Sequence, residues 1–155
     1  MGDNAFSAAD ERFMAMALEE ARKALEADEV PIGAIIVSPR GRILGRGHNL
    51  TEALCDVTAH AEMQAMTAAA STLGGKYLQG CTLYVTVEPC LMCAGAIGWA
   101  QIGRIVYGAA DPKRGYRSLI PAASSPFHPR ARVEGGLMAE ASAAMMQSFF
   151  RAKRT

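Results

Sequence analysis

The stretch EVPIGAIIVSPRGRILGRGHN, from Glu29 to Asn49, contains two runs of β-branched and aliphatic residues separated by the turn-forming sequence SPRG. Two such runs around a short turn with Pro and Gly are typical of a β-hairpin. The preceding segment has a helical pattern, because apolar residues recur every four positions from Phe13 to Leu25. Ser7 and Asp10 have the spacing of a helix-capping pair. We therefore expect the chain to begin with a helix followed by a hairpin.

Helical and extended segments alternate after the hairpin. The patterns predict helices over 60–75 and 90–101 and strands over 81–87 and 104–109. Residues 111–132 are expected to be mostly loop with one short helix at most, and 133–154 to form a short extended piece and a C-terminal helix. Strands separated by helices place helices on the faces of a sheet. The sequence thus predicts the α/β class, with a three-layer α-β-α sandwich around a mixed five-stranded sheet, mixed because one pair is a hairpin.

Bulk composition is that of an ordinary soluble domain. The 155 residues match the size of one compact domain, and half of them are apolar while 20% are charged. The apolar runs are too short for a membrane span and no signal peptide is apparent, so we expect a cytoplasmic protein with no membrane association. Its four cysteines should then be reduced. Cys55 and Cys81, which lack a paired motif, are expected to be buried structural thiols.

Charge is distributed unevenly along the chain. From Asp111 to the end there are eight Lys/Arg against three Asp/Glu, whereas the preceding part has eight against twelve. This asymmetry predicts one localised positive surface, which would suit a nucleic acid. A solvated basic tail explains the same counts equally well.

Two short motifs bring chemistry-bearing residues to predicted helix starts. They are TAHAEMQA, from Thr58 to Ala65, and VEPCLMCAGA, from Val87 to Ala96. His60, Cys90 and Cys93 supply an imidazole and two thiolates, an ordinary ligand set for zinc (Zn²⁺). Three protein ligands leave the fourth position open for a water whose pKa the metal lowers, which is the arrangement of catalytic zinc.

Glu62 completes the candidate site without being a ligand. It follows His60 by two residues on the first helical turn, where a carboxylate can carry protons between a water and a substrate. Alone, His-x-Glu is most often a surface pair, and Cys-x-x-Cys can be a redox dithiol or a pair of core thiols. Together, as H-A-E followed by P-C-x-x-C, they match the signature H-x-E…P-C-x-x-C of zinc nucleobase deaminases.

Over nearly its full length the chain resembles the bacterial tRNA-specific adenosine deaminases of the TadA type, within the cytidine-deaminase-like superfamily. The matching stretches occur in the family's order: EVPIGAIIV, GRGHN, TAHAEMQA, LYVTVEPCLMCAGAI, GRIVYGA, DPKRG and FFRAKR. The resemblance implies one zinc-dependent deaminase domain over residues 1–155 with the cytidine deaminase-like fold. It also implies hydrolytic deamination of adenosine to inosine at the wobble position of a tRNA anticodon, by a homodimer that binds the anticodon stem-loop.

The resemblance also assigns roles residue by residue. Zinc would be held by His60, Cys90 and Cys93, with Glu62 as the catalytic proton carrier. Asn49 would hydrogen-bond the purine, since an amide both donates and accepts. The remaining substrate contacts are Val30, Pro31, Ala61, Val87 and Glu88. The RNA contacts are Asp111, Lys113, Arg114, Phe149, Phe150, Arg151 and Arg154.

The basic, aromatic end of the chain suits stacking on unpaired bases together with phosphate contact. A structural alternative exists for Phe149 and Phe150, because either ring could simply pack the last helix.

Several departures from the family pattern concern the pocket and the RNA side. Val57 replaces a usual Pro, Cys55 a common His, and Ala110 a frequent Arg. A deaminase of a free base or nucleoside, such as guanine or cytosine, would use the same zinc chemistry without a basic surface. A non-catalytic zinc protein or a dithiol redox module is a further alternative. The first would need a fourth protein ligand and the second leaves His60 and Glu62 without a role.

Overall fold

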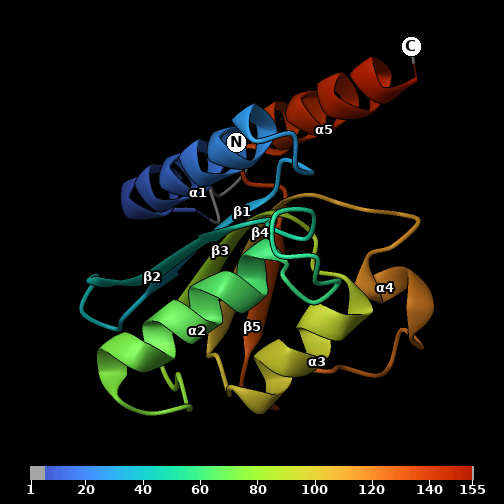
Figure 1. Ribbon diagram of the computed structural model, residues 1–155. Helices are drawn as coiled ribbons and strands as arrows, with labels where there is room; N and C mark the ends of the chain where they lie inside the picture. The colour runs from blue at the N-terminus through green and yellow to red at the C-terminus, as the bar shows by residue number, and fades with distance from the viewer. Residues whose placement is uncertain (1–5, 155) are drawn as a thin grey trace.

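The computed structural model describes residues 6–154 and contains the predicted alternation of helices and strands (Figure 1). The elements in chain order are α1 (Ala8–Glu26), β1 (Gly33–Val37), β2 (Ile43–His48), α2 (Ala61–Leu73), β3 (Thr82–Val87), α3 (Leu91–Trp99), β4 (Arg104–Ala109), α4 (Tyr116–Leu119), β5 (Arg132–Gly135) and α5 (Ala139–Lys153). The short extended piece expected before the last helix is β5, and α4 is the short helix within the long loop.

The five strands form one mixed sheet in the order β2-β1-β3-β4-β5. Strand β1 pairs antiparallel with both β2 and β3, whereas β3, β4 and β5 pair in parallel. The parallel connections need crossover helices, which α3 provides between β3 and β4. The predicted mixed five-stranded sheet is therefore confirmed.

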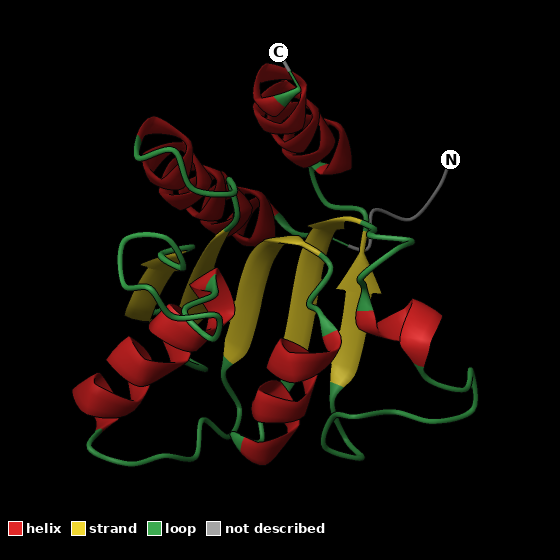
Figure 2. Cartoon of the chain, turned by 45° about the vertical axis from the view of Figure 1, so that its right-hand side comes forward, coloured by secondary structure: helices red, strands yellow, loops and turns green. Residues whose placement is uncertain are grey.

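Helices cover both faces of the sheet. Figure 1 shows α1 and α5 on one face and α2 and α3 on the other, and Figure 2 shows the sheet between these two layers. Each face has its own apolar core: Met14, Ala17 and Tyr84 belong to the α1 side, and Ala65 and Ile97 to the α2 and α3 side. The three-layer α-β-α architecture agrees with the expectation.

Two local predictions are confirmed: the capping pair at the start of α1 and the turn between β1 and β2. The Ser7 hydroxyl accepts from the Asp10 N–H and the Asp10 carboxylate accepts from the Ser7 N–H, both at 3.0 Å, which is a complete capping box. The SPRG turn is closed by the Gly41 N–H donating to the Ser38 carbonyl at 2.9 Å. Within residues 6–154, no helix combines the length and apolarity that a membrane crossing requires.

One edge of the sheet gathers the segments that carry the quoted motifs. The pairings Gly33↔His48 and Ala34↔Val85 bring the start of β1 beside the ends of β2 and β3. The parallel pairing Val87↔Ala109 adds the end of β4. Chain segments that leave this edge therefore meet there, as ligand-binding segments do in open α/β sheets.

Candidate active site

The three candidate metal ligands converge at the starts of two helices. His60 is the N-cap residue of α2, Cys90 is the N-cap residue of α3, and Cys93 lies in the first turn of α3. The donor atoms of all three lie within 4.8 Å of one another. The Nδ1 atom of His60 is 3.5 Å from Cys90 Sγ and 3.4 Å from Cys93 Sγ. The structure thus brings together residues that the sequence separates by about thirty positions.

The three candidate ligands are close enough to shift one another's pKa values. A hydrogen bond from the Cys93 thiol, assisted by His60, lowers the pKa of Cys90 to about 4. The same contact raises the pKa of Cys93, and the contact with Cys90 raises the pKa of His60. Of the two cysteines, Cys90 is therefore the one that loses its proton more readily, and the thiolate is the metal-binding form of cysteine. One imidazole nitrogen and two sulfurs are a donor set that fits zinc.

Close contact between a strand and a helix sets the position of α2. A Cβ atom on Gly47 would lie 2.3 Å from the Ala61 carbonyl oxygen and 2.6 Å from the Ala65 nitrogen, so only glycine allows this approach. Gly45 makes the equivalent contact one turn further on, where a Cβ would lie 2.4 Å from the Ala65 carbonyl oxygen. The backbone of β2 therefore fixes the first turn of α2, between His60 and Glu62.

Glu62 is buried beside the candidate ligands, with 4% of its surface exposed. Burial raises the pKa of Glu62 to about 7, and the nearby Cys90 thiolate acts in the same direction. The carboxyl group also hydrogen-bonds Cys93 and its own backbone amide, which oppose the rise. A group that titrates near neutral pH can both take and return a proton, as the predicted role requires.

A pocket of about 510 Å³ opens beside His60. Its other walls come from the loop after β2: Thr51, Glu52, Cys55, Asp56 and Val57. Two of the departures from the family pattern, Cys55 and Val57, therefore line the space next to the metal cluster. The expectation that Cys55 is buried is wrong, because the loop turns it to the surface, whereas Cys81 is buried as expected and all four cysteines are free thiols.

Sequence reasoning missed the residue that holds this loop. Glu29 is 1% exposed, and its carboxylate accepts from the Glu52 N–H at 3.0 Å and the Ala53 N–H at 2.7 Å. A buried carboxylate needs such donors. The available signal was an acidic residue directly before the apolar run of β1, a position where burial is expected.

The predicted substrate contacts lie around the same sheet edge. Asn49 is buried directly after β2, donates its N–H to the Ile32 carbonyl at 3.2 Å and accepts from the Thr51 N–H at 3.4 Å. Pro31 and Ala61 are buried and Val30 is half-buried. Val87, the last residue of β3 at this edge, lines a second hollow, between the end of β4 and α5. The roles of these residues toward a substrate stay predictions.

Glu88, also predicted to touch the substrate, has both oxygens engaged elsewhere. They accept from the backbone N–H groups of Asp111 and Arg117, each at 3.1 Å. The Arg117 guanidinium adds a third contact at 3.3 Å. Sequence reasoning missed Arg117, whose only signal was its place in the basic loop.

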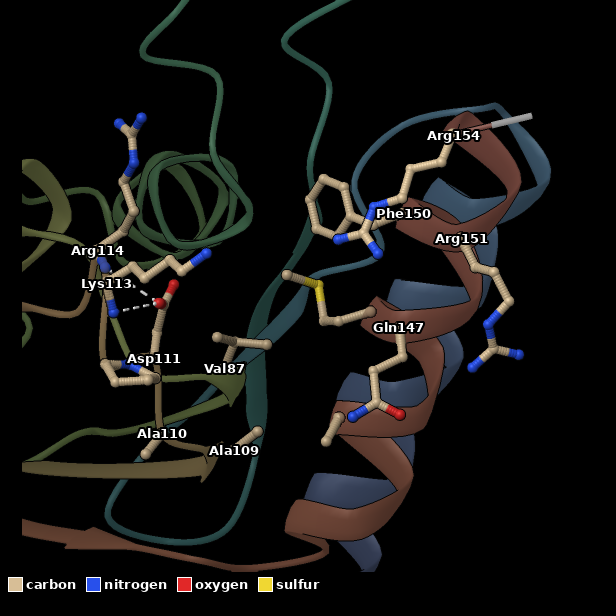
Figure 3. A pocket seen from close by; sticks show the side chains of 13 residues that line it. Val87, Ala109, Ala110, Asp111, Lys113, Arg114, Gln147, Phe150, Arg151 and Arg154 are labelled. Carbon is tan, nitrogen blue, oxygen red and sulfur yellow. Dashed lines mark hydrogen bonds between the residues drawn. The ribbon is translucent and has the colours of Figure 1, made fainter.

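A groove of about 770 Å³ lies between the segment after β4 and α5 (Figure 3). Six of the seven predicted RNA contacts line it: Asp111, Lys113, Arg114, Phe150, Arg151 and Arg154. Ala110 lines it as well, so the third departure from the family pattern faces this groove. The seventh residue, Phe149, is 8% exposed and packs edge-on against Phe150 at 5.2 Å between ring centroids. The structure therefore favours the packing alternative for Phe149.

Two histidines lie outside the candidate metal site formed by His60, Cys90 and Cys93. His48 contacts the Glu20 carboxylate at 3.2 Å through Nδ1, at the end of β2. His128 accepts from the Arg130 N–H at 3.1 Å in the loop before β5.

Comparisons with known proteins agree with this geometry. The family model of the cytidine and deoxycytidylate deaminase zinc-binding region matches residues 7–109. A tRNA-specific adenosine deaminase of Agrobacterium fabrum is 49% identical over 92% of this chain and 94% of its own. A solved structure of a tRNA:A34 deaminase, from a study of A-to-I editing at the wobble position, is 46% identical with a TM-score of 0.77, covering 86% of this chain and 98% of its own. A guanine deaminase of Bacillus subtilis is 39% identical with a TM-score of 0.61, over 64% of each chain.

Proposed function

The chain belongs to the cytidine and deoxycytidylate deaminase zinc-binding family, and we propose that it is a hydrolytic deaminase that converts adenosine to inosine at the wobble position of a tRNA anticodon. The observation that carries this function is the buried Glu62 beside the convergent His60, Cys90 and Cys93. Similarity to tRNA-specific adenosine deaminases over most of the chain supports adenosine in tRNA as the substrate. Water replaces the amino group at C6 of the purine, and ammonia leaves.

His60, Cys90 and Cys93 would hold zinc, which when bound supplies a Lewis acid that makes a water acidic enough to attack at neutral pH. Glu62 would accept a proton from the attacking water on its carboxylate. The same carboxyl then gives a proton to the departing amine nitrogen, so that ammonia rather than an amide anion leaves. The pKa of Glu62, raised to about 7 by burial, matches both transfers.

The buried sheet edge orients the base. Asn49 has its oxygen 3.4 Å from the Thr51 N–H, which fixes the amide plane and leaves its NH₂ group to donate to the purine. Val30, Pro31 and Ala61 supply apolar walls that exclude bulk water from the ring. Val87 lines the groove beside α5.

The groove between the segment after β4 and α5 is the proposed RNA surface. Lys113, Arg114, Arg151 and Arg154 bring positive charge to phosphates from two sides, and the Phe150 ring is 43% exposed for stacking. Four of the eight Lys and Arg residues that follow Ala110 therefore line one hollow.

Three further features belong to the same proposal. The zinc-dependent deaminase domain extends over residues 1–155, and a tRNA substrate implies a cytoplasmic enzyme. A second copy of the chain would cover exposed apolar side chains such as Trp99, which is 84% exposed, and Val57, which is 82% exposed. The sedimentation mass of the purified protein distinguishes a homodimer from a monomer.

Deamination of a free base is the second candidate, favoured by the structural similarity to a guanine deaminase. The test measures ammonia release by zinc-loaded protein from an anticodon stem-loop with adenosine at the wobble position, and separately from guanine, cytosine and adenosine. We expect inosine in the stem-loop and no turnover of the free bases. Turnover of guanine or cytosine with an inert stem-loop would replace the tRNA function by the second candidate.

A further inference from the structure

Glu88 connects two segments of the chain. One is the metal-binding segment 89–93, which contains the candidate ligands Cys90 and Cys93, and the other is the segment 111–117 that follows β4. Glu88 follows the end of β3 and precedes Cys90 by two residues, and only 4% of its surface is exposed. One carboxylate oxygen, Oε1, accepts from the Asp111 N–H at 3.1 Å and from the Arg117 guanidinium at 3.3 Å. The other, Oε2, accepts from the Arg117 N–H at 3.1 Å. A single side chain therefore binds both ends of the segment 111–117.

Backbone contacts reinforce this connection on both sides of Glu88. Its own N–H donates to the Ala109 carbonyl at 2.8 Å, and the Tyr116 N–H donates to the Pro89 carbonyl at 2.9 Å. Cys90 and Gly115 form an isolated β-bridge. The segment 111–117 is thus attached directly to the chain that presents a candidate zinc ligand.

Gly115 makes room for the carboxylate. A Cβ atom at this position would lie 2.3 Å from Cδ and Oε2 of Glu88 and 2.5 Å from the Asp111 carbonyl oxygen. Glycine is therefore the residue that lets the segment close around the Glu88 side chain.

The attached segment is the one that carries the proposed RNA contacts. Asp111 closes it internally, since its Oδ1 accepts from the Lys113 N–H at 3.1 Å and the Arg114 N–H at 3.0 Å. Lys113 and Arg114 line the groove opposite α5 (Figure 3). On the far side, the Arg117 guanidinium lies over the Tyr107 ring at 5.4 Å, and Tyr116 is buried in the core. The basic residues therefore stand on a fixed turn rather than a free loop.

We propose that Glu88 is a positioning residue that holds the 111–117 segment against the metal-binding segment, and so sets the distance between the RNA contacts and the reacting adenosine. This inference rests on the proposed tRNA function. It assigns Glu88 a role through the loop in place of direct substrate contact, because both its oxygens are already engaged by that loop.

The decisive variant is Glu88→Gln, which keeps the size of the side chain. A glutamine oxygen can replace only one carboxylate oxygen, and its NH₂ group then faces a backbone N–H that has lost its acceptor. We expect KM for the stem-loop to rise by about tenfold or more, since one lost buried hydrogen bond corresponds to that factor. We expect an unchanged kcat and an unchanged zinc content, because the metal cluster and Glu62 are intact.

A second readout needs no RNA. Trypsin cleaves after Lys113, Arg114 and Arg117, so release of the segment should accelerate cleavage there in Glu88→Gln. Arg117→Met removes one of the three contacts and should give a smaller rise in KM, about two- to threefold. Gly115→Ala disturbs the same contact from the opposite side, and we expect it to repeat the Glu88→Gln pattern. It is the variant to measure if Glu88→Gln folds poorly.

Asp10→Asn is the matched control. Asp10 is an equally buried carboxylate, but it binds Arg104 and Tyr84 on the α1 side of the sheet. It should lower stability without changing KM or cleavage of the 111–117 segment. The inference is overturned if Glu88→Gln leaves KM and cleavage at wild-type values, or loses zinc and kcat instead. An inert stem-loop with the wild-type enzyme refutes the tRNA function and the RNA role of Glu88, while the cleavage rates still decide whether Glu88 holds the segment.

Discussion

Glu62 and Glu88 occupy closely comparable places, one at the start of α2 and the other at the end of β3. Each is 4% exposed, and each lies two residues from a candidate zinc ligand, Glu62 after His60 and Glu88 before Cys90. Their surroundings differ. Glu88 receives two backbone N–H groups and a guanidinium, whereas burial dominates around Glu62 and raises its pKa to about 7.

The difference teaches that donors, rather than residue type, burial or spacing, decide what a buried carboxylate does. Fixed N–H groups hold a carboxylate in one orientation and make it a structural connection. A carboxylate that is buried with fewer donors keeps both charge states accessible and can transfer protons. The comparison is sharpest when each carboxylate is neutralised separately.

The largest effect is expected from Glu62→Gln, which retains the shape of the side chain but cannot carry a proton. We expect kcat to fall by about 10²- to 10⁴-fold, the usual contribution of a general acid–base group. Zinc content should stay at the wild-type value, as in Glu88→Gln. KM for the stem-loop should also be unchanged, so the effects on kcat and KM are the reverse of those expected for Glu88→Gln. Loss of zinc from Glu62→Gln would show that Glu62 is a zinc ligand, and the contrast between a proton-carrying Glu62 and a positioning Glu88 would then be wrong.

An intermediate effect is expected from Gly47→Ala, which acts on the Glu62 side through the backbone. The added Cβ would lie 2.3 Å from the Ala61 carbonyl oxygen and must displace the first turn of α2. We expect kcat/KM to fall by about 10- to 100-fold, because small displacements of catalytic groups have effects of that order. Zinc affinity should fall as well, as measured by competition with a chelator.

Gly45→Ala is the control for that variant, since its Cβ would meet Ala65 one turn further along α2. It should lower the melting temperature by a similar amount and leave zinc affinity closer to wild type. Equal losses of zinc in both variants would mean that α2 moves as a rigid whole.

The smallest effect on catalysis is expected from Asp10→Asn, which removes a buried carboxylate far from both segments. A hydrogen bond from Arg104, joined by donors from Tyr84 and Ser7, holds the pKa of Asp10 well below its ordinary value. Because the folded-state pKa is lowered, this stabilisation is complete above the unfolded value of about 3.9 and is lost as pH falls through the folded value. The wild type should therefore lose stability below about pH 4, and Asp10→Asn should show a flatter acid limb in thermal melts with an unchanged kcat. An unaltered acid limb in Asp10→Asn would assign that loss to other carboxylates.

Sequence patterns predicted the fold because its local signals agree with one another. The capping box at Ser7, the SPRG turn and the alternation of helices and strands each specify one element. The order of strands in the sheet could not be obtained in this way, since it depends on pairings such as Ala34↔Val85 between distant residues. The weakly patterned β5 was predicted only as an extended piece.

For the site, sequence reasoning identified residues defined by chemistry and missed residues defined by geometry. The convergence of His60, Cys90 and Cys93 was predictable because few residue types can bind zinc. Glu29, Gly47 and Arg117 act through backbone groups that are remote in the chain, and a single sequence carries no record of those contacts. The exposure of Cys55 depends in the same way on the path of its loop.

The convergence of His60, Cys90 and Cys93 has a consequence for folding as well as for chemistry. These candidate ligands come from the starts of two helices, and His60 and Cys90 are thirty residues apart in the chain. An ion bound to all three would act as a cross-link between the two ends of the chain segment from His60 to Cys90. Its binding free energy would add to the free energy of folding. The supply of zinc in the cell would then govern how much folded enzyme accumulates, not only how active each molecule is.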